Sequence, residues 1–140
     1  MQVGNAVVER IRVRYGETDA MGHAYYANYL YWFEVARGAW CRAHGFTYRS
    51  LEEEGYKLPV VEVGARYRGE VKYDDEISVR AWISELKRAS LKFEYEVTNE
   101  STGTVTTTGF TWHVVVGVTM KAVTIPPFLR ERLEPPSVSP

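Results

Sequence analysis

The sequence has little cysteine, no long apolar run and almost no net charge. Its single cysteine, Cys41, cannot form an internal disulfide, which indicates a small buried apolar group in a reducing compartment. No apolar run approaches the roughly 20 residues that span a bilayer, and the opening MQVGNAVVERIRV lacks the basic-then-apolar pattern of a signal peptide. We therefore expect a cytoplasmic protein with no membrane span.

The charge balance argues against a nucleic-acid-binding protein. Lys and Arg number 17 against 18 Asp and Glu, whereas nucleic-acid binders usually carry a strong basic excess.

With 140 residues, 45% of them hydrophobic, the chain has the size and composition of one ordered domain. Prolines are concentrated near the end, which predicts a domain over residues 1–134 and a loose Pro-rich tail over 135–140.

Hydrophobic periodicity predicts one strand followed by one long helix. Residues 7–15 alternate, with Arg10, Arg12 and Arg14 on one face and mostly apolar residues on the other. Residues 26–44 change to a helical period, with Gly45 as the stop signal. The residues that share the main helical face are Tyr29, Phe33, Ala36, Trp40 and Ala43.

Four further strands are expected after the helix, over residues 57–72, 77–84, 91–98 and 104–118. In the last of these, Phe110, Trp112, Val114 and Val116 share a face. Short turns between the late strands favour antiparallel pairing, so the fold class is α+β, with a curved sheet around the single helix. Pairing two sheets edge to edge would cover exposed strand edges, and an aromatic content of 14% suits extensive interfaces. A homodimer is therefore expected.

The segment between the first strand and the helix carries the candidate chemistry. It reads YGETDAMGHAYYANY, in which Asp19 lies in a turn, Gly22 allows a tight path, and the helix begins near Tyr26. Free N–H groups at a helix start can polarise a carbonyl oxygen, and Asp19 is close enough in sequence to face the same carbonyl carbon. The alternative interpretation is that Asp19 only caps the turn, which is the common role of Asp at such positions.

The run RYGETDAMGHAYYANYLYWFEVARGAW resembles the signature of hotdog-fold acyl-CoA thioesterases of the 4-hydroxybenzoyl-CoA thioesterase type. The similarity continues through LPVVEV, ARYRGEVKYDDEI and LKRASLKFEYEV, and covers roughly residues 10–127. This resemblance implies a five-stranded antiparallel sheet wrapped around one long helix, and an enzyme that hydrolyses acyl-CoA without a cofactor. The matching positions are Tyr15, Asp19, Gly22, Tyr29, Phe33, Glu34, Ala36 and Arg37.

Carried over by position, the resemblance assigns Asp19 as nucleophile or general base, and the Tyr26 N–H as the group that polarises the thioester carbonyl. Tyr15 matches a tyrosine of the Tol–Pal-linked branch, although that branch has a catalytic histidine where this chain has Tyr26. His23 is a candidate proton carrier or a locally hydrogen-bonded loop residue. Gly22-His23 resembles a branch active on longer acyl chains, so the branch signals conflict and the acyl group is left open.

Lys87 and Arg88 match a basic position that contacts CoA phosphates in the resembling enzyme, often across the dimer; a solvated turn is the alternative. With Gly22 they are the expected substrate-binding residues. Glu34 and Arg37 have the spacing of an intrahelical ion pair. The histidines and Cys41 lack metal-ligand spacing, so no metal site is expected.

Two functions from different classes follow. The first is an acyl-CoA thioesterase that works as a homodimer or homotetramer. The alternative is a non-catalytic protein that binds or senses acyl-CoA or acyl-ACP on the same fold, because a fold does not determine a function. A hotdog dehydratase is the weakest candidate, since it needs a catalytic histidine together with an acidic residue on the helix, where only Glu34 is available.

Overall fold

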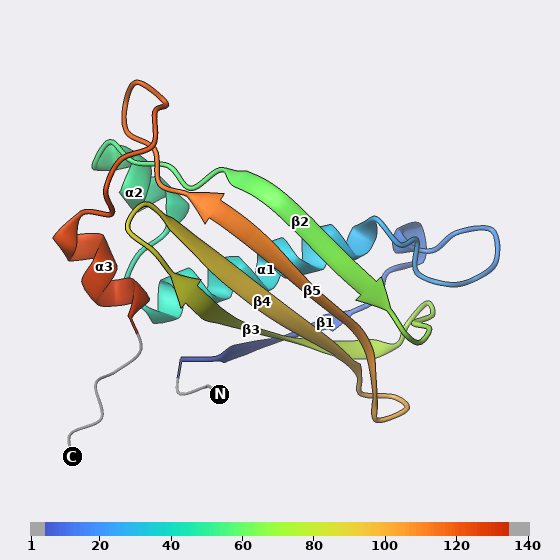
Figure 1. The fold of residues 1–140 in the computed structure, drawn as a ribbon. Helices are drawn as coiled ribbons and strands as arrows, with labels where there is room; N and C mark the ends of the chain where they lie inside the picture. The colour runs from blue at the N-terminus through green and yellow to red at the C-terminus, as the bar shows by residue number, and fades with distance from the viewer. Residues whose placement is uncertain (1–4, 135–140) are drawn as a thin grey trace, which may run out of the picture.

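The computed structural model describes residues 5–134 and consists of one curved sheet and one long helix (Figure 1). Five strands form the antiparallel sheet in the order β1-β3-β4-β5-β2. Their bounds are β1 Val7–Arg12, β2 Val60–Tyr67, β3 Glu76–Leu86, β4 Ser90–Asn99 and β5 Thr104–Val114. The hotdog fold expected from the sequence is thus confirmed; the predicted tail over residues 135–140 lies outside the described residues.

Helix α1 (Asn28–Ala43) lies along the concave face of the sheet (Figure 1). Tyr29, Phe33, Ala36 and Trp40 are buried against the sheet, as their spacing predicted, whereas Ala43, the fifth residue expected on this face, is exposed at the end of the helix. Phe33 stacks on the Tyr95 ring, with ring centroids 4.4 Å apart. This close packing depends on Gly109, because a side chain there would overlap the Phe33 ring.

Strand β4 shows how one face of the sheet covers the core. Every second residue is buried, in the pattern that alternating apolar residues produce when one face of a sheet covers a core. The inward side chains of this strand are Leu91, Phe93, Tyr95 and Val97. Full burial of an apolar side chain such as Leu91, Phe93 or Val97 contributes about 1.5–3 kcal/mol.

Strand β5 buries a different face from the one that its apolar residues suggest. Thr111 and His113 are buried, whereas Phe110, Trp112 and Val114 are only half-buried. Hydrogen bonds explain this orientation, since the Thr111 hydroxyl lies 2.6 Å from the Tyr95 hydroxyl and 2.8 Å from His113 Nε2. Thr111 and His113 of β5 can therefore be buried in the core, because both have hydrogen-bond partners there.

Three short helices complete the described chain. The 3₁₀ helix η1 (Tyr15–Glu17) follows β1, and α2 (Tyr48–Glu53) follows α1. Helix α3 (Pro127–Leu133) begins at a proline, whose fixed φ suits the first turn of a helix, and buries Leu129 and Leu133. No helix of residues 5–134 is long and apolar enough to cross a membrane.

Candidate active site

The loop between η1 and α1 forms a compact turn around Asp19. The Asp19 Oδ1 atom accepts hydrogen bonds from the backbone N–H groups of Met21, at 2.9 Å, and His23, at 3.3 Å. The Asp19 N–H donates to the His23 carbonyl at 2.8 Å, and the Gly22 N–H donates to the Asp19 carbonyl at 3.0 Å. The turn-capping role of Asp19 is therefore present, and it fixes the orientation of the carboxylate.

This capping leaves half of the carboxylate available. No hydrogen bond to Asp19 Oδ2 is found within residues 5–134, and the residue is exposed on the protomer surface. Gly22 makes the tight turn possible, because its φ of +83° lies in the left-handed region that other residues adopt only with strain. The loop thus presents a held carboxylate with one free oxygen.

The tip of α1 begins two residues later than expected. Tyr26 and Ala27 lie in a turn, and Asn28 is the first helical residue. Within the described part of the chain, the N–H groups of Tyr26 and Ala27 donate to no protein acceptor, as is usual for the first donors of a helix. The Tyr26 carbonyl accepts a hydrogen bond from the Tyr67 hydroxyl at 3.0 Å, which ties this tip to the end of β2.

Glu17 connects the turn to the helix, and sequence reasoning did not single it out. Its side chain is buried; Oε1 accepts from the Arg14 N–H at 2.7 Å, and Oε2 accepts from the Trp32 indole at 3.1 Å. Its carbonyl accepts from the Tyr25 N–H and from Asn28 Nδ2, both at 2.8 Å. One residue therefore fixes both ends of the Asp19 loop.

The electrostatics of Glu17 agree with this role. Burial by itself raises the pKa of the carboxyl, but hydrogen bonds from Arg14 and Trp32 and the charge of Arg14 outweigh it, and the net pKa lies below its usual value. Glu17 is therefore ionised at neutral pH, and its hydrogen bonds are charge-assisted.

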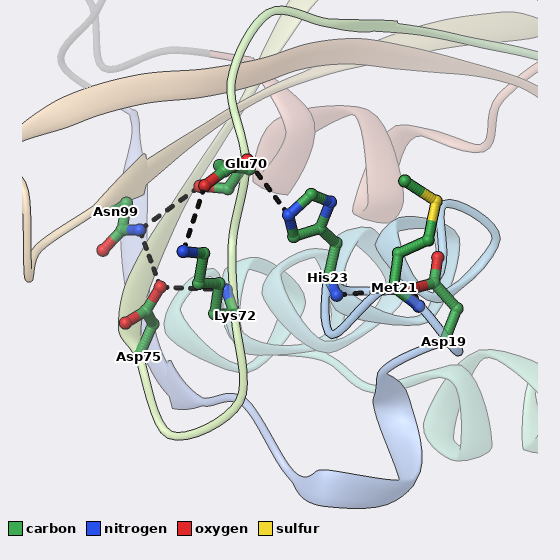
Figure 2. Close-up of polar contacts among 7 residues, drawn as sticks. All are labelled: Asp19, Met21, His23, Glu70, Lys72, Asp75 and Asn99. Atoms are coloured by element: carbon green, nitrogen blue, oxygen red, sulfur yellow. Dashed lines mark hydrogen bonds and ion pairs between the residues drawn. The ribbon is translucent and has the colours of Figure 1, made fainter.

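The His23 side chain lies apart from the Asp19 carboxylate. Figure 2 shows the imidazole extending towards the connection between β2 and β3, where its Nε2 lies 3.1 Å from Glu70 Oε2. Lys72 Nζ lies 3.3 Å from the other oxygen of Glu70. His23 thus reaches Asp19 through its backbone N–H, while its ring holds the loop to the neighbouring connection.

The structure places the other expected residues at two separate locations. Tyr15 is 78% exposed, and its ring contacts the Tyr73 ring edge-on at 5.6 Å. Lys87 and Arg88 lie in the β3–β4 turn, at the far end of α1 from the Asp19 loop (Figure 1). A helix of 16 residues is roughly 24 Å long, so one protomer does not bring these cations to its own Asp19.

Two other sequence expectations can be compared with the structure. Glu34 and Arg37 form no ion pair within residues 5–134, so that prediction is wrong: Arg37 donates to the Tyr48 and Tyr95 hydroxyls instead. Cys41 is a buried free thiol, as expected. No group of three or more His, Cys, Asp or Glu residues suited to a metal ion occurs in the described part of the chain.

Comparison with known proteins defines the class. Residues 13–133 match the family model described as the thioesterase-like superfamily, so the chain belongs to that family. A Bacillus subtilis relative, YneP, provisionally named an acyl-CoA thioesterase, is 37% identical over 65% of this chain and 66% of its own length. The acyl-CoA thioesterase YbgC of Haemophilus influenzae is 39% identical over 60% of this chain and 62% of its own length.

Solved structures give the same class. A DHNA-CoA thioesterase from Staphylococcus aureus superimposes with a TM-score of 0.85 at 32% identity, covering 91% of this chain and 87% of that one. The expected family, the hotdog fold and the thioesterase class are therefore confirmed. The roles of individual residues stay predictions.

Proposed function

We propose that this protein hydrolyses the thioester of a CoA-linked acyl group to a free acid and CoA, with Asp19 as the reacting carboxylate. The observation that carries the proposal is the arrangement of Asp19, whose Oδ1 is fixed by two backbone N–H groups while Oδ2 has no partner in the described chain. The free N–H groups of Tyr26 and Ala27, at the end of the same loop, supply an electropositive helix tip. The names of the relatives support the same reaction.

The chemistry can follow two routes from this arrangement. In the first, Asp19 Oδ2 attacks the thioester carbon, the Tyr26 N–H stabilises the oxyanion, and the carbon–sulfur bond breaks to release CoA thiolate and an acyl-aspartyl anhydride that water hydrolyses. In the second, Asp19 accepts a proton from water as that water attacks the same carbon, and the tetrahedral intermediate then breaks its carbon–sulfur bond to release CoA thiolate and the free acid. His23 and Tyr15 complete the proposed site, with His23 holding the loop through Glu70.

A homodimer formed through β2 is part of the proposal. This strand is an edge of the sheet, and its side chains are mostly exposed on both faces, including Val60, Val61, Val63 and Tyr67. Antiparallel pairing with the same strand of a second copy would satisfy its free backbone groups. The exposed apolar residues of α1, including Leu30, Tyr31 and Val35, offer a second surface for a homotetramer.

This pairing would also explain the position of Lys87 and Arg88. The β3–β4 turn lies at the Val60 end of β2, whereas the Asp19 loop lies at the Tyr67 end (Figure 1). Antiparallel pairing brings the Val60 end of one protomer to the Tyr67 end of the other. The two cations would then face the partner's Asp19 and bind the phosphates of CoA. A cytoplasmic location completes the proposal, and the single buried thiol of Cys41 supports it.

The function is tested by thiol release from a panel of short-chain, medium-chain, long-chain and aromatic acyl-CoAs, with calorimetric binding measured for the same compounds. We expect turnover of at least one class, and the preferred class identifies the acyl group. Binding without thiol release from any class would contradict hydrolysis and favour the non-catalytic acyl-CoA binder.

A further inference from the structure

Arg37 is a buried cation without an anionic partner. It lies in α1 and is 8% exposed; its Nε donates to the Tyr48 hydroxyl, and its Nη1 donates to the Tyr95 hydroxyl at 2.9 Å. Within residues 5–134, no carboxylate lies within 4.0 Å of the guanidinium, and Nη2 has no acceptor. Since a buried charge is costly unless it is paired, this arrangement requires an explanation.

The groups that surround Arg37 do not neutralise it. Burial raises the pKa of Tyr48 to about 12, although Arg37 opposes this shift, and burial also raises the pKa of Tyr95. Burial and the charge of Arg37 lower the pKa of His113 to about 4. At neutral pH these three side chains are therefore uncharged. Tyr48 and Tyr95 accept hydrogen bonds from the guanidinium, and His113 is linked to Tyr95 through the Thr111 hydroxyl.

A cavity of about 310 Å³ lies beside this group, between α1, α2, the segment before β2 and Met120 of the loop after β5. Arg37 and Tyr48 contribute polar walls, and Leu58 and Pro59 contribute apolar ones. The volume is at the lower end of the range for small-molecule pockets, roughly 300–1,000 Å³. Because the Tyr48 oxygen accepts from Arg37, its own O–H can donate to a ligand.

We propose that this cavity binds a small organic carboxylate, with the carboxylate on Arg37 and the Tyr48 hydroxyl and the apolar body against Leu58 and Pro59. A carboxylate supplies the acceptor oxygens that Nη2 lacks, and the planar guanidinium suits its geometry. Arg37 is nine positions beyond Asn28, roughly 14 Å along the helix, so this site is distinct from the Asp19 loop.

The rim of the cavity makes the proposal testable. Lys57 favours an anion, whereas the exposed carboxylates of Glu34 and Glu52 oppose one through solvent-screened repulsion. Removing one rim carboxylate should therefore strengthen carboxylate binding. Glu53, the next residue on α2, is exposed and does not line this cavity, which makes it a matched control.

The experiment uses the unmodified protein with acetate, hexanoate and benzoate as probes, and benzamide as the uncharged analogue of benzoate. Ligand-observed NMR titrations should detect at least one carboxylate and show benzamide binding at least 10-fold more weakly. Glu52→Gln should tighten binding of that carboxylate several-fold, and Glu53→Gln should leave it unchanged. Arg37→Met, checked for folding by circular dichroism, should abolish binding.

Three results would overturn the proposal: no binding of any carboxylate at millimolar concentration, equal binding of benzoate and benzamide, or equal effects of the Glu52 and Glu53 substitutions. If Arg37→Met does not fold, the comparison of Glu52→Gln with Glu53→Gln decides, because both positions are exposed. The assay contains no thioester, so its outcome is independent of the proposed hydrolysis.

Discussion

Replacing Glu17 by Gln tests whether the loop that carries Asp19 is held by a buried carboxylate. Glu17 accepts from the Arg14 N–H, the Trp32 indole and the Arg14 guanidinium, at 2.7, 3.1 and 3.2 Å. Gln retains one acceptor oxygen, but its amide places a donor against one of these donors. A hydrogen bond to a charged group contributes about 1.5–3 kcal/mol, so we expect the free energy of unfolding to fall by about 2 kcal/mol.

The same substitution should slow thiol release more than it weakens substrate binding. Because the Glu17 carbonyl also fixes Tyr25 and Asn28, a looser Glu17 changes the position of Asp19 relative to the helix tip. We expect kcat to fall by roughly 10-fold or more, since misplacement by about 1 Å is costly in a preorganised site. KM should change less.

The pH dependence of stability provides an independent check. The folded-state pKa of Glu17 lies below its unfolded value, so its stabilisation is fully present above the ordinary pKa of a glutamate side chain and is lost as the pH falls through the folded pKa. Urea unfolding from pH 7 to pH 3 should therefore show a smaller loss in Glu17→Gln than in the wild type. An unfolding free energy within about 0.5 kcal/mol of wild type together with an unchanged kcat would refute this reasoning.

Three further predictions concern the loop, the cations and the edge strand. Gly22→Ala should lower the free energy of unfolding in urea by about 1–2 kcal/mol, because the φ of +83° is strained for alanine even though its Cβ would meet no neighbour. Wild-type stability of this variant would show that the turn carries no such strain. The double substitution Lys87→Gln and Arg88→Gln should raise KM for acyl-CoA severalfold with little change in kcat, and Lys121→Gln, on another loop, is the control. Equal KM values for the wild type and both variants would show that Lys87 and Arg88 do not bind the CoA phosphates. In analytical ultracentrifugation the wild type should sediment as a dimer or tetramer. Val61→Lys, in the exposed edge of β2, should sediment at half that size, as a monomer in place of a dimer or as an α1-linked dimer in place of a tetramer; an unaltered assembly would place the interface elsewhere.

Much of the fold follows from local patterns. The alternation in β4 and the helical spacing around Phe33 and Trp40 are strong signals, because each places apolar side chains on one face. The sheet order does not follow from such patterns, since β1 pairs with β3, and β2 with β5, across long stretches of chain. In β5 the apolar residues mark the less buried face, because Thr111 and His113 find hydrogen-bond partners in the core.

The candidate site was only partly predictable for a related reason. The turn, the helix start and Gly22 are visible in the sequence, whereas the burial of Glu17 depends on Trp32, fifteen positions away. The burial of Arg37 could have been predicted, because it lies four residues after Phe33 and four before Cys41, on the buried face of α1. The pairing with Glu34 failed because Arg37 turns towards the phenols of Tyr48 and Tyr95.

The central claim is that the Asp19 carboxylate reacts with the thioester or activates the water that does. It is tested most directly by thiol release and acyl-CoA binding in Asp19→Asn, with Asp74→Asn as the matched control. Asp74 is an exposed turn residue with a φ of +69°, a conformation that Asn tolerates. We predict that Asp19→Asn lowers kcat by roughly 100-fold or more while acyl-CoA still binds, and that Asp74→Asn retains wild-type turnover. Wild-type turnover in Asp19→Asn would contradict the account.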